Sequence, residues 1–398
     1  MACTAIGFVS NGVQASFGVF FKSLEADFGL TRTSTSGIYS AHLLLSMVFA
    51  ISGGWAIDRY GFRAPVIVMG LFVGLGLILT SQANTLWHLY ISYSLLLAMG
   101  IGAIAPTLFA VASGWFIKRR GLILGIIIAG FYIGISVFAP ITAYLISSYG
   151  WRTSFLILSL SGFLLIIPFA LLLKSAPSEA AVLREGEMLD AANFDLTETQ
   201  ANSQLKDYSL NQAVKTKSFW VLFLNWFLGG FIFYSLMAHL VPHATDLGIL
   251  PAAAVSIISL FSSVSIVGSV LVGLISDRIG KRRSLLGCSL FMGAAMFWLV
   301  WSSNLWALYL YAVAFGLSFG GFMPPLAALI GDTFGLRHLG KIQAVMEASW
   351  MLGGALGPIF VGYLFDRSGG YFISFLVLTV TALVPGVLII LLKPPKDS

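Results

Sequence analysis

The chain has 398 residues, of which 58% are hydrophobic and only 10% are charged, whereas soluble domains average about 45–50% apolar and roughly 25% charged residues. So few charged side chains cannot cover the surface of a soluble protein, and 32 Phe, 13 Tyr and 10 Trp residues exclude a solvated, disordered chain. The formal charge of +6 fits the basic loops that orient membrane proteins better than it fits nucleic-acid binding. The composition therefore predicts an integral membrane protein.

Twelve segments are long and apolar enough to cross a bilayer as helices, which takes about 20 residues each. The first begins at the N-terminus with no basic region before it, which predicts a first span rather than a cleaved signal peptide. Residues 175–217 hold seven of the sixteen acidic residues and predict a polar linker. The predicted spans lie near 3–24, 35–58, 64–82, 86–116, 121–148, 153–174, 218–242, 251–276, 284–302, 305–331, 341–365 and 371–392.

The basic residues are distributed unequally over the loops between these spans. With both termini in the cytoplasm, eighteen of the 22 Lys and Arg residues lie on the inner side, and only Lys22, Arg32, Arg152 and Arg367 lie outside. Cytoplasmic loops of membrane proteins carry such an excess of positive charge. The pattern predicts a multi-pass protein of the plasma (inner) membrane with both termini cytoplasmic.

An internal repeat divides the chain into two halves. The loop motif Gly54-x-x-x-Asp58-Arg59-x-Gly61-x-Arg63 recurs as Gly273-x-x-x-Asp277-Arg278-x-Gly280-x-Arg282, with every position shifted by the same distance along the chain, which we call the repeat offset. A second echo relates Gly150-Trp151-Arg152 to Gly370-Tyr371-Phe372, at a shift one position longer. We expect an all-α membrane protein whose twelve transmembrane helices form two pseudo-symmetric six-helix halves, 1–174 and 218–398, with the substrate site between them.

The repeated loops carry a carboxylate and guanidinium groups at helix junctions, where they can pair and hold one face of the protein shut. The alternative is that these residues only anchor the loops at the membrane interface. We predict a gating role for Asp58, Arg59, Arg63, Asp277, Arg278 and Arg282.

The doubled loop motif resembles that of the major facilitator superfamily, and the resemblance covers essentially the whole chain. Several stretches are similar to the monocarboxylate-porter branch and its bacterial oxalate/formate-exchanger relatives: Ser16-Phe17-Gly18-Val19-Phe20-Phe21-Lys22, Trp115-Phe116-x-Lys118-Arg119-Arg120, Gly150-Trp151-Arg152 and Asp366-Arg367-x-Gly369. The resemblance implies a twelve-helix major facilitator fold and a secondary transporter, commonly of a small carboxylate together with a proton.

The sequence departs from this branch where the carboxylate would bind. Members carry an Arg in the eighth span, one turn beyond an Asp, but this chain has Ser269 and Ser265 at those positions. Some animal members also have a Lys where this chain has Ala15. Three explanations remain: the substrate needs no buried cation, the chain recognises an anion through hydrogen bonds and helix ends, or Ser269 is an introduced substitution.

Polar side chains inside the predicted spans are the candidates for the substrate site. Each also has a structural interpretation, because serines pack membrane helices closely and buried histidines hydrogen-bond loops. His239 and Glu347 are proton-coupling candidates; histidine titrates near neutral pH. His42 likewise has a functional and a structural interpretation. The predicted substrate-binding residues are Asn11, Gln14, Tyr132, Asn225, Tyr234, His239, Ser265 and Ser269.

The predicted function is secondary active transport of a small organic anion, most specifically a monocarboxylate such as lactate, by proton symport or anion exchange through alternating access. The alternatives are an exporter of neutral or amphipathic compounds and a non-transporting receptor. An enzyme is not expected, because no catalytic set is assembled; Gly316-x-Ser318-x-Gly320 lies in an apolar helix and indicates close helix packing. We expect no cofactor, metal or nucleic-acid partner, and a monomer in the lipid bilayer.

Overall fold

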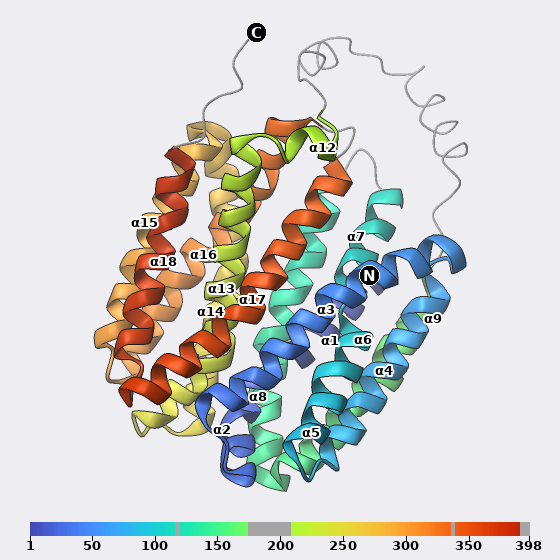
Figure 1. The fold of residues 1–398 in the computed structure, drawn as a ribbon, viewed down its shortest axis with the longest axis vertical. Coiled ribbons are helices and arrows are strands. Elements are labelled where there is room, and N and C mark those ends of the chain that lie inside the picture. Colours follow the sequence, from blue (N-terminus) through green and yellow to red (C-terminus); the bar gives the residue numbers. More distant parts are fainter. Residues whose placement is uncertain (116–119, 174–207, 336–338, 391–398) are drawn as a thin grey trace.

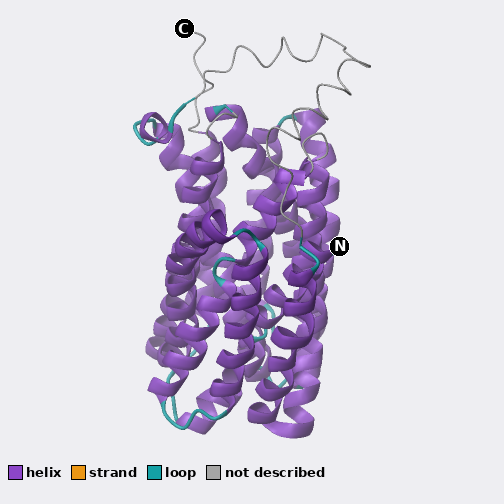
Figure 2. Ribbon diagram, turned by 90° about the vertical axis from the view of Figure 1, so that its right-hand side faces the viewer, coloured by secondary structure: helices purple, strands orange, loops and turns teal. Residues whose placement is uncertain are grey.

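The computed structural model describes residues 1–115, 120–173, 208–335 and 339–390, and throughout these ranges the chain is helical, with short turns and no strand (Figure 2). The helices run side by side along the long axis of the molecule (Figures 1 and 2). Most of the predicted linker, 175–217, lies outside the described residues.

The first half supplies six crossings from eleven helical segments. The first crossing divides at Ser16, whose hydroxyl donates to the Gly12 carbonyl at 2.8 Å. The fourth is not one continuous α-helix, because it contains a π-helical stretch and a break near residues 102–103. The segments are α1 (Ala2–Ala15), α2 (Phe17–Phe28), α3 (Arg32–Tyr60), α4 (Arg63–Ser81), α5 (Leu86–Leu89), the π-helix η1 (Tyr90–Leu96), α6 (Leu97–Ile101), α7 (Ile104–Trp115), α8 (Arg120–Ser161), the π-helix η2 (Gly162–Ile166) and α9 (Ile167–Leu171).

The second half has longer uninterrupted helices. A short helix within the predicted linker, α12, precedes the long helix α13. Thr216 caps the N-terminus of α13 by accepting a hydrogen bond from the amide of Phe219. The segments are α12 (Leu210–Ala213), α13 (Lys217–Asp246), α14 (Pro251–Ile279), α15 (Lys281–Trp301), α16 (Leu305–Phe334), α17 (Leu339–Ser368) and α18 (Phe372–Ile390).

Ten stretches of the described chain are long and apolar enough to cross a membrane. One of them, Gly125–Leu171, has 47 residues and is divided at Gly150, whose φ of 77° ends one helix before the next begins. The segments α1 and α2, with 14 and 12 residues, together supply one further crossing. This gives the twelve predicted spans of a multi-pass membrane protein.

The backbone repeats the duplication found in the sequence. Glycines with positive φ, a conformation that L side chains rarely adopt, occur in three pairs that are each separated by the repeat offset: Gly29 and Gly248, Gly61 and Gly280, Gly150 and Gly369. The last pair corrects the sequence alignment, which matched Gly150 with Gly370. The second half therefore has one extra residue between this turn and its last helix.

Close helix packing repeats in the same register. A Cβ atom on Gly134 of α8 would overlap the carbonyl oxygen of Phe8 in α1, and one on Gly353 of α17 would overlap that of Phe227 in α13. The two glycines are separated by the repeat offset, and so are the two phenylalanines. Such glycines let membrane helices approach backbone to backbone.

The string Gly316-x-Ser318-x-Gly320 is part of the same kind of packing. A Cβ atom on Gly316 would meet the Phe261 carbonyl oxygen at 2.7 Å, and one on Gly320 would overlap that of Ser265. These glycines hold α16 against α14, as the packing interpretation predicted.

The two halves meet along α2 and α13, α3 and α17, and α8 and α14. In Figure 1 the first half runs from blue to blue-green and the second half from yellow-green to red. Gly18 packs against the carbonyl oxygen of Met237, and the repeat offset makes Met237 the equivalent of Gly18 itself. Contact between equivalent positions places this point close to the axis that relates the two halves.

Candidate functional site

Polar contacts between the halves gather toward one end of the helix bundle. We call this the closed end; it contains the start of α3 and the ends of α2, α13 and α17, at the bottom of Figure 1. In the described residues, the hydrogen bonds and ion pairs between the halves all lie here or between Ser136 of α8 and Ser259 and Ser263 of α14. No such contact joins the opposite ends of the described halves.

Arg32 lies at the centre of the closed end. Its side chain is only 4% exposed, and its Nη2 donates to both carboxylate oxygens of Asp246 at 3.1 and 2.9 Å. Its Nε lies 3.2 Å from the Glu25 carboxylate. Aromatic rings face the guanidinium, which is 5.4 Å from the centroid of Phe21, 4.9 Å from Phe365 and 5.9 Å from Tyr371.

Asp366 of α17 caps the N-terminus of α3 across the boundary between the halves. Its carboxylate accepts from the amides of Arg32 and Thr33 at 3.1 and 2.9 Å and from the Thr33 hydroxyl at 2.5 Å. The first amides of a helix have no partner within the helix and favour negative charge. A second ion pair between the halves joins Lys22 to Asp246.

A related pair stays inside the first half. The repeat offset makes Asp27 the equivalent of Asp246, and the Asp27 carboxylate accepts from Arg152 at 2.8 Å. Equivalent aspartates thus have different partners: one lies in the same half and the other in the opposite half.

His239 lies within the closed end and is completely buried. Its Nε2 is 2.9 Å from the Pro358 carbonyl oxygen and 3.0 Å from the Ser36 hydroxyl, and its Nδ1 is 3.0 Å from the Tyr371 hydroxyl. Because a carbonyl only accepts, we assign the proton to Nε2, and Nδ1 then accepts from Tyr371. His239 therefore joins α13, α3 and α17, and its role in proton coupling stays a prediction.

A buried polar cluster lies deeper in the first half. We call it the Gln14 cluster; it consists of Gln14, Tyr39, His42 and Tyr93. The amide nitrogen of Gln14 lies 3.3 Å from His42 Nε2. The ring of His42 stacks on Tyr39 with centroids 6.2 Å apart and lies 5.5 Å from Tyr93.

Three polar atoms of the Gln14 cluster have no hydrogen-bond partner among the described residues: the hydroxyls of Tyr39 and Tyr93, and Nδ1 of His42. A buried polar group without a partner destabilises a fold by about 1–3 kcal/mol. Tyr93 lies in the π-helix η1, a conformation frequent at functional sites, and the neighbouring Ser94 hydroxyl donates to the Ile38 carbonyl of α3 at 2.7 Å. The Gln14 cluster therefore holds three buried donor or acceptor groups that the described part of the chain does not satisfy.

The second half reaches the Gln14 cluster through Tyr234. The ring of Tyr234 lies 6.0 Å from that of Tyr39, and Trp350 lies 6.2 Å from Tyr234 on the other side. The structure thus brings together the predicted site residues Gln14 and Tyr234 with His42, at the boundary between the halves.

Other predicted substrate contacts are engaged with their own helices. Asn225 Nδ2 donates to the Val221 carbonyl at 2.7 Å, whereas its Oδ1 is buried with no hydrogen-bond partner among the described residues. The Asn11 amide lies 3.4 Å from the carbonyl of Gly7. The hydroxyls of Ser265 and Ser269 donate to the carbonyls of Phe261 and Ile266, both at 2.8 Å. Tyr132 is buried among apolar residues of both halves. Substrate contact by these residues stays a prediction.

Of the residues toward the opposite end, Glu347 is half-buried on α17, with its carboxylate 3.5 Å from the Gln343 amide. Arg59 stacks on Trp55 and Tyr60, with its guanidinium carbon 5.5 and 5.6 Å from the ring centroids.

The other predicted gating residues do not yet define a gate. Arg63 donates to the Leu173 carbonyl of its own half at 2.8 Å. Arg278 is exposed, and Arg282 is half-buried. The side chains of Asp58 and Asp277 lie outside the described part, so the predicted gate at this end stays a prediction.

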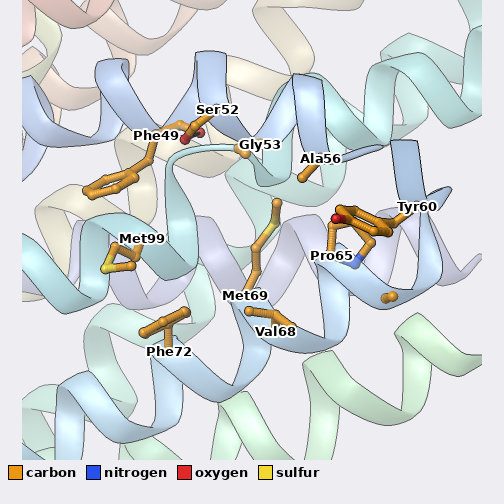
Figure 3. Close-up of a pocket in the computed structure, with 12 residues that line it drawn as sticks. Phe49, Ser52, Gly53, Ala56, Tyr60, Pro65, Val68, Met69, Phe72 and Met99 are labelled. Carbon is orange, nitrogen blue, oxygen red and sulfur yellow. Dashed lines mark hydrogen bonds between the residues drawn. The ribbon is translucent and has the colours of Figure 1, made fainter. Parts of the chain in front are cut away.

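One cavity lies away from the Gln14 cluster and the closed end. It has a volume of about 470 Å³ and lies within the first half between α3, α4 and α6 (Figure 3). Figure 3 shows Phe49 and Gly53 facing Met69 and Phe72 across it. Ser52 and Tyr60 bring the hydroxyls of this otherwise apolar lining. None of its lining residues belongs to the second half.

Sequence reasoning missed the residues that close one end. Arg32 and Lys22 are two of the four basic residues assigned to the outer side, and this rarity was a usable signal. Asp246 and Asp366 lie at the ends of α13 and α17, but their partners are distant in sequence, so no motif relates them.

The comparisons with known proteins agree with this architecture. The model of the Major Facilitator Superfamily matches residues 3–256 and 240–398. Monocarboxylate transporter 13 of Rattus norvegicus is 27% identical over 370 residues, covering 92% of this chain and 81% of the relative. Monocarboxylate transporter 2 of Homo sapiens is 26% identical over 392 residues, covering 92% and 79%.

Solved structures show the same fold. A D-xylose–proton symporter superposes with a TM-score of 0.76 at 14% identity, covering 100% of this chain and 98% of the other. A bacterial homologue of the human lysosomal transporter Spinster gives 0.74 at 16% identity, covering 98% and 95%. With both halves matched by the family model and the fold shared, the chain belongs to the Major Facilitator Superfamily.

Proposed function

We propose that the chain is a secondary active transporter of a small monocarboxylate such as lactate, coupled to a proton or a counter-anion. The observation that carries this proposal is the Gln14 cluster, with its unpartnered buried hydroxyls of Tyr39 and Tyr93. A carboxylate only accepts hydrogen bonds, so two phenolic donors and the Gln14 amide can bind it without an Arg in the eighth span. The names of the sequence relatives support the same substrate class.

The surroundings of the Gln14 cluster suit a small, partly apolar anion. Phe17 stacks on Tyr39 with ring centroids 4.7 Å apart, and Tyr234 lies beside Tyr39 from the other half. An aromatic site accommodates the methyl group of lactate, while the polar groups bind its carboxylate.

Transport itself would follow from alternating access. In the proposed cycle residues 1–174 rock against 218–398, the closed end separates, and the predicted Asp58 and Asp277 loops close the opposite end. The protein would act as a monomer in the plasma (inner) membrane with both termini cytoplasmic, so that the closed end faces outward.

The deciding experiment is uptake into proteoliposomes that contain the purified full chain. Radiolabelled L-lactate, formate and oxalate are supplied with and without an inward proton gradient. We expect saturable L-lactate uptake, which the gradient or a trapped counter-anion accelerates. Uptake of a neutral solute with no movement of any carboxylate would contradict the proposal.

Glu347 is the residue whose replacement tests proton coupling. A half-buried carboxyl group in a membrane helix can carry a proton as the protein changes conformation. We expect Glu347→Gln to retain L-lactate counterflow but to lose most of the acceleration by a proton gradient. An unchanged response to the gradient would remove Glu347 from the coupling mechanism.

The second candidate function, export of neutral or amphipathic compounds, rests on Ser269. If the natural substrate is neutral, Ser269→Arg should create carboxylate uptake where the unaltered chain has none. If the natural substrate is a carboxylate bound by the Gln14 cluster, the same change should reduce uptake, because a buried cation without a partner is costly. Uptake of L-lactate by both proteins separates the two functions.

A further inference from the structure

Arg32 has more hydrogen-bond donors than the closed end satisfies. Its Nη2 is engaged with Asp246, but Nη1 and Nε have no hydrogen-bond partner among the described residues. The Glu25 oxygen at 3.2 Å from Nε forms an ion pair that lacks hydrogen-bond geometry. A guanidinium that is 4% exposed and only partly bonded retains capacity for another acceptor.

Apart from Glu25, an acidic residue of the first half, the groups that meet at the closed end divide by charge between the halves. The first half supplies Arg32, Lys22 and the free amides at the start of α3, whereas the second half supplies the carboxylates of Asp246 and Asp366. Helix N-termini and guanidinium groups both bind carboxylates. The first half therefore presents an anion site that the second half fills with two aspartates.

Separation of the halves would empty this site. The first half would keep Arg32, Lys22 and Glu25, a net charge of about +1, and the second half would withdraw the two negative charges of Asp246 and Asp366. We propose that Arg32, Lys22 and the first amides of α3 then form an entry site for the transported carboxylate, and that Asp246 and Asp366 compete with the substrate for it. This inference rests on the proposed function.

A continuous aromatic row leads from this site to the Gln14 cluster. Phe21 lies under the Arg32 guanidinium, its ring is 5.9 Å from Phe17, and Phe17 stacks on Tyr39. A carboxylate would thus be attracted by a cation near the surface and passed to neutral donors inside. The division explains how an anion transporter can function with Ser269 where relatives carry Arg.

Competition between the two aspartates and the substrate predicts a result that differs from that of residues which only hold the closed end shut. Binding of radiolabelled L-lactate is measured on the full chain in lipid nanodiscs. Asp246→Asn removes a competing carboxylate, so we expect the dissociation constant to fall about tenfold, whereas Arg32→Gln removes the site and should raise it about tenfold or more. If the residues only hold the end shut, both variants open it, and the constants shift in the same direction.

The chain provides a matched control for Asp246. Asp27→Asn changes the equivalent residue in the first half, which pairs with Arg152, and should leave L-lactate affinity unchanged. If Asp246→Asn does not fold, Asp366→Asn removes the other competing carboxylate and should also strengthen L-lactate binding. Shifts in opposite directions for the Asp and Arg variants support the entry site, and shifts in one direction overturn it.

The two proposals fail separately. If the unaltered chain transports no carboxylate but Asp246→Asn binds L-lactate in an Arg32-dependent manner, the carboxylate-binding site at Arg32 stands and the proposed function is wrong. If uptake of L-lactate is normal and Arg32→Gln binds it as tightly as the unaltered chain, the entry site is wrong and the function stands. If neither the unaltered chain nor either Asp variant binds L-lactate, formate or oxalate, both are wrong.

Discussion

Replacing Tyr39 and Tyr93 together by Phe should nearly abolish L-lactate transport without destabilising the protein. The variant Tyr39→Phe/Tyr93→Phe removes two hydroxyl groups and leaves both rings in place. Hydrogen bonds to charged groups contribute about 1.5–3 kcal/mol each. We therefore expect the ratio of the maximal L-lactate uptake rate to KM to fall at least about a hundredfold. The measurement is initial uptake of radiolabelled L-lactate into proteoliposomes.

Stability separates this prediction from a trivial loss of structure. Both hydroxyls are buried with no hydrogen-bond partner among the described residues, so their removal should leave the melting temperature unchanged or raise it. Tyr311→Phe is the control: Tyr311 is equally buried, in α16, and its hydroxyl lies 3.6 Å from the Met296 sulfur. A double variant that melts earlier, or that transports normally, would contradict a ligand-binding role.

The glycines of the repeated helix contact should give the second large effect, on folding. A Cβ atom at Gly353 would overlap the Phe227 carbonyl oxygen, which belongs to the backbone and cannot move without shifting α13. Overpacking of this kind costs typically about 1–3 kcal/mol. We therefore expect Gly353→Ala to lower the melting temperature and the yield of folded protein, and Gly134→Ala to do the same in the first half.

The control is a glycine whose replacement by Ala should not destabilise the protein. Gly287 lies within α15, and a Cβ atom there meets no neighbour within 4 Å. Because Ala favours the helix over Gly by about 0.8–1 kcal/mol, Gly287→Ala should leave stability unchanged or raise it. Equal melting temperatures for Gly353→Ala and Gly287→Ala would show that the contact between α13 and α17 is looser than the structure indicates.

The sequence predicts the fold well because its signals are local. Long apolar runs identify the spans, and the repeat of Asp58-Arg59 at Asp277-Arg278 identifies the two halves. The same repeat offset reappears in the backbone at Gly61 and Gly280. Where local signals weaken, the prediction loses detail: the π-helical turn at Tyr93 and the division at Ser16 have no marker in the apolar pattern.

The candidate site is less predictable because its residues come from separate helices. Gln14 and Tyr234 were identified as polar residues inside spans, but Tyr39 and Tyr93 look like ordinary aromatic residues until their unpartnered hydroxyls are seen together. Ser265 shows the converse. Ser265 became a candidate substrate contact because it occupies the position where relatives carry an Asp. In the structure its hydroxyl donates to its own helix and its backbone packs against Gly320.

The different partners of Asp27 and Asp246 have a consequence for the symmetry of closure. Both residues lie at the closed end, so two identical halves would each contribute the same ion pairs there. Here Arg152 neutralises Asp27 within its own half, whereas the motif that echoes Gly150-Trp151-Arg152 ends on Phe372 in place of the arginine. The second aspartate is thereby left to bind the opposite half. One missing guanidinium is enough to make the two halves contribute unequally to closure of this end. Because Asp246 binds Arg32 and Lys22 of the opposite half by ion pairs, higher ionic strength should weaken the closure.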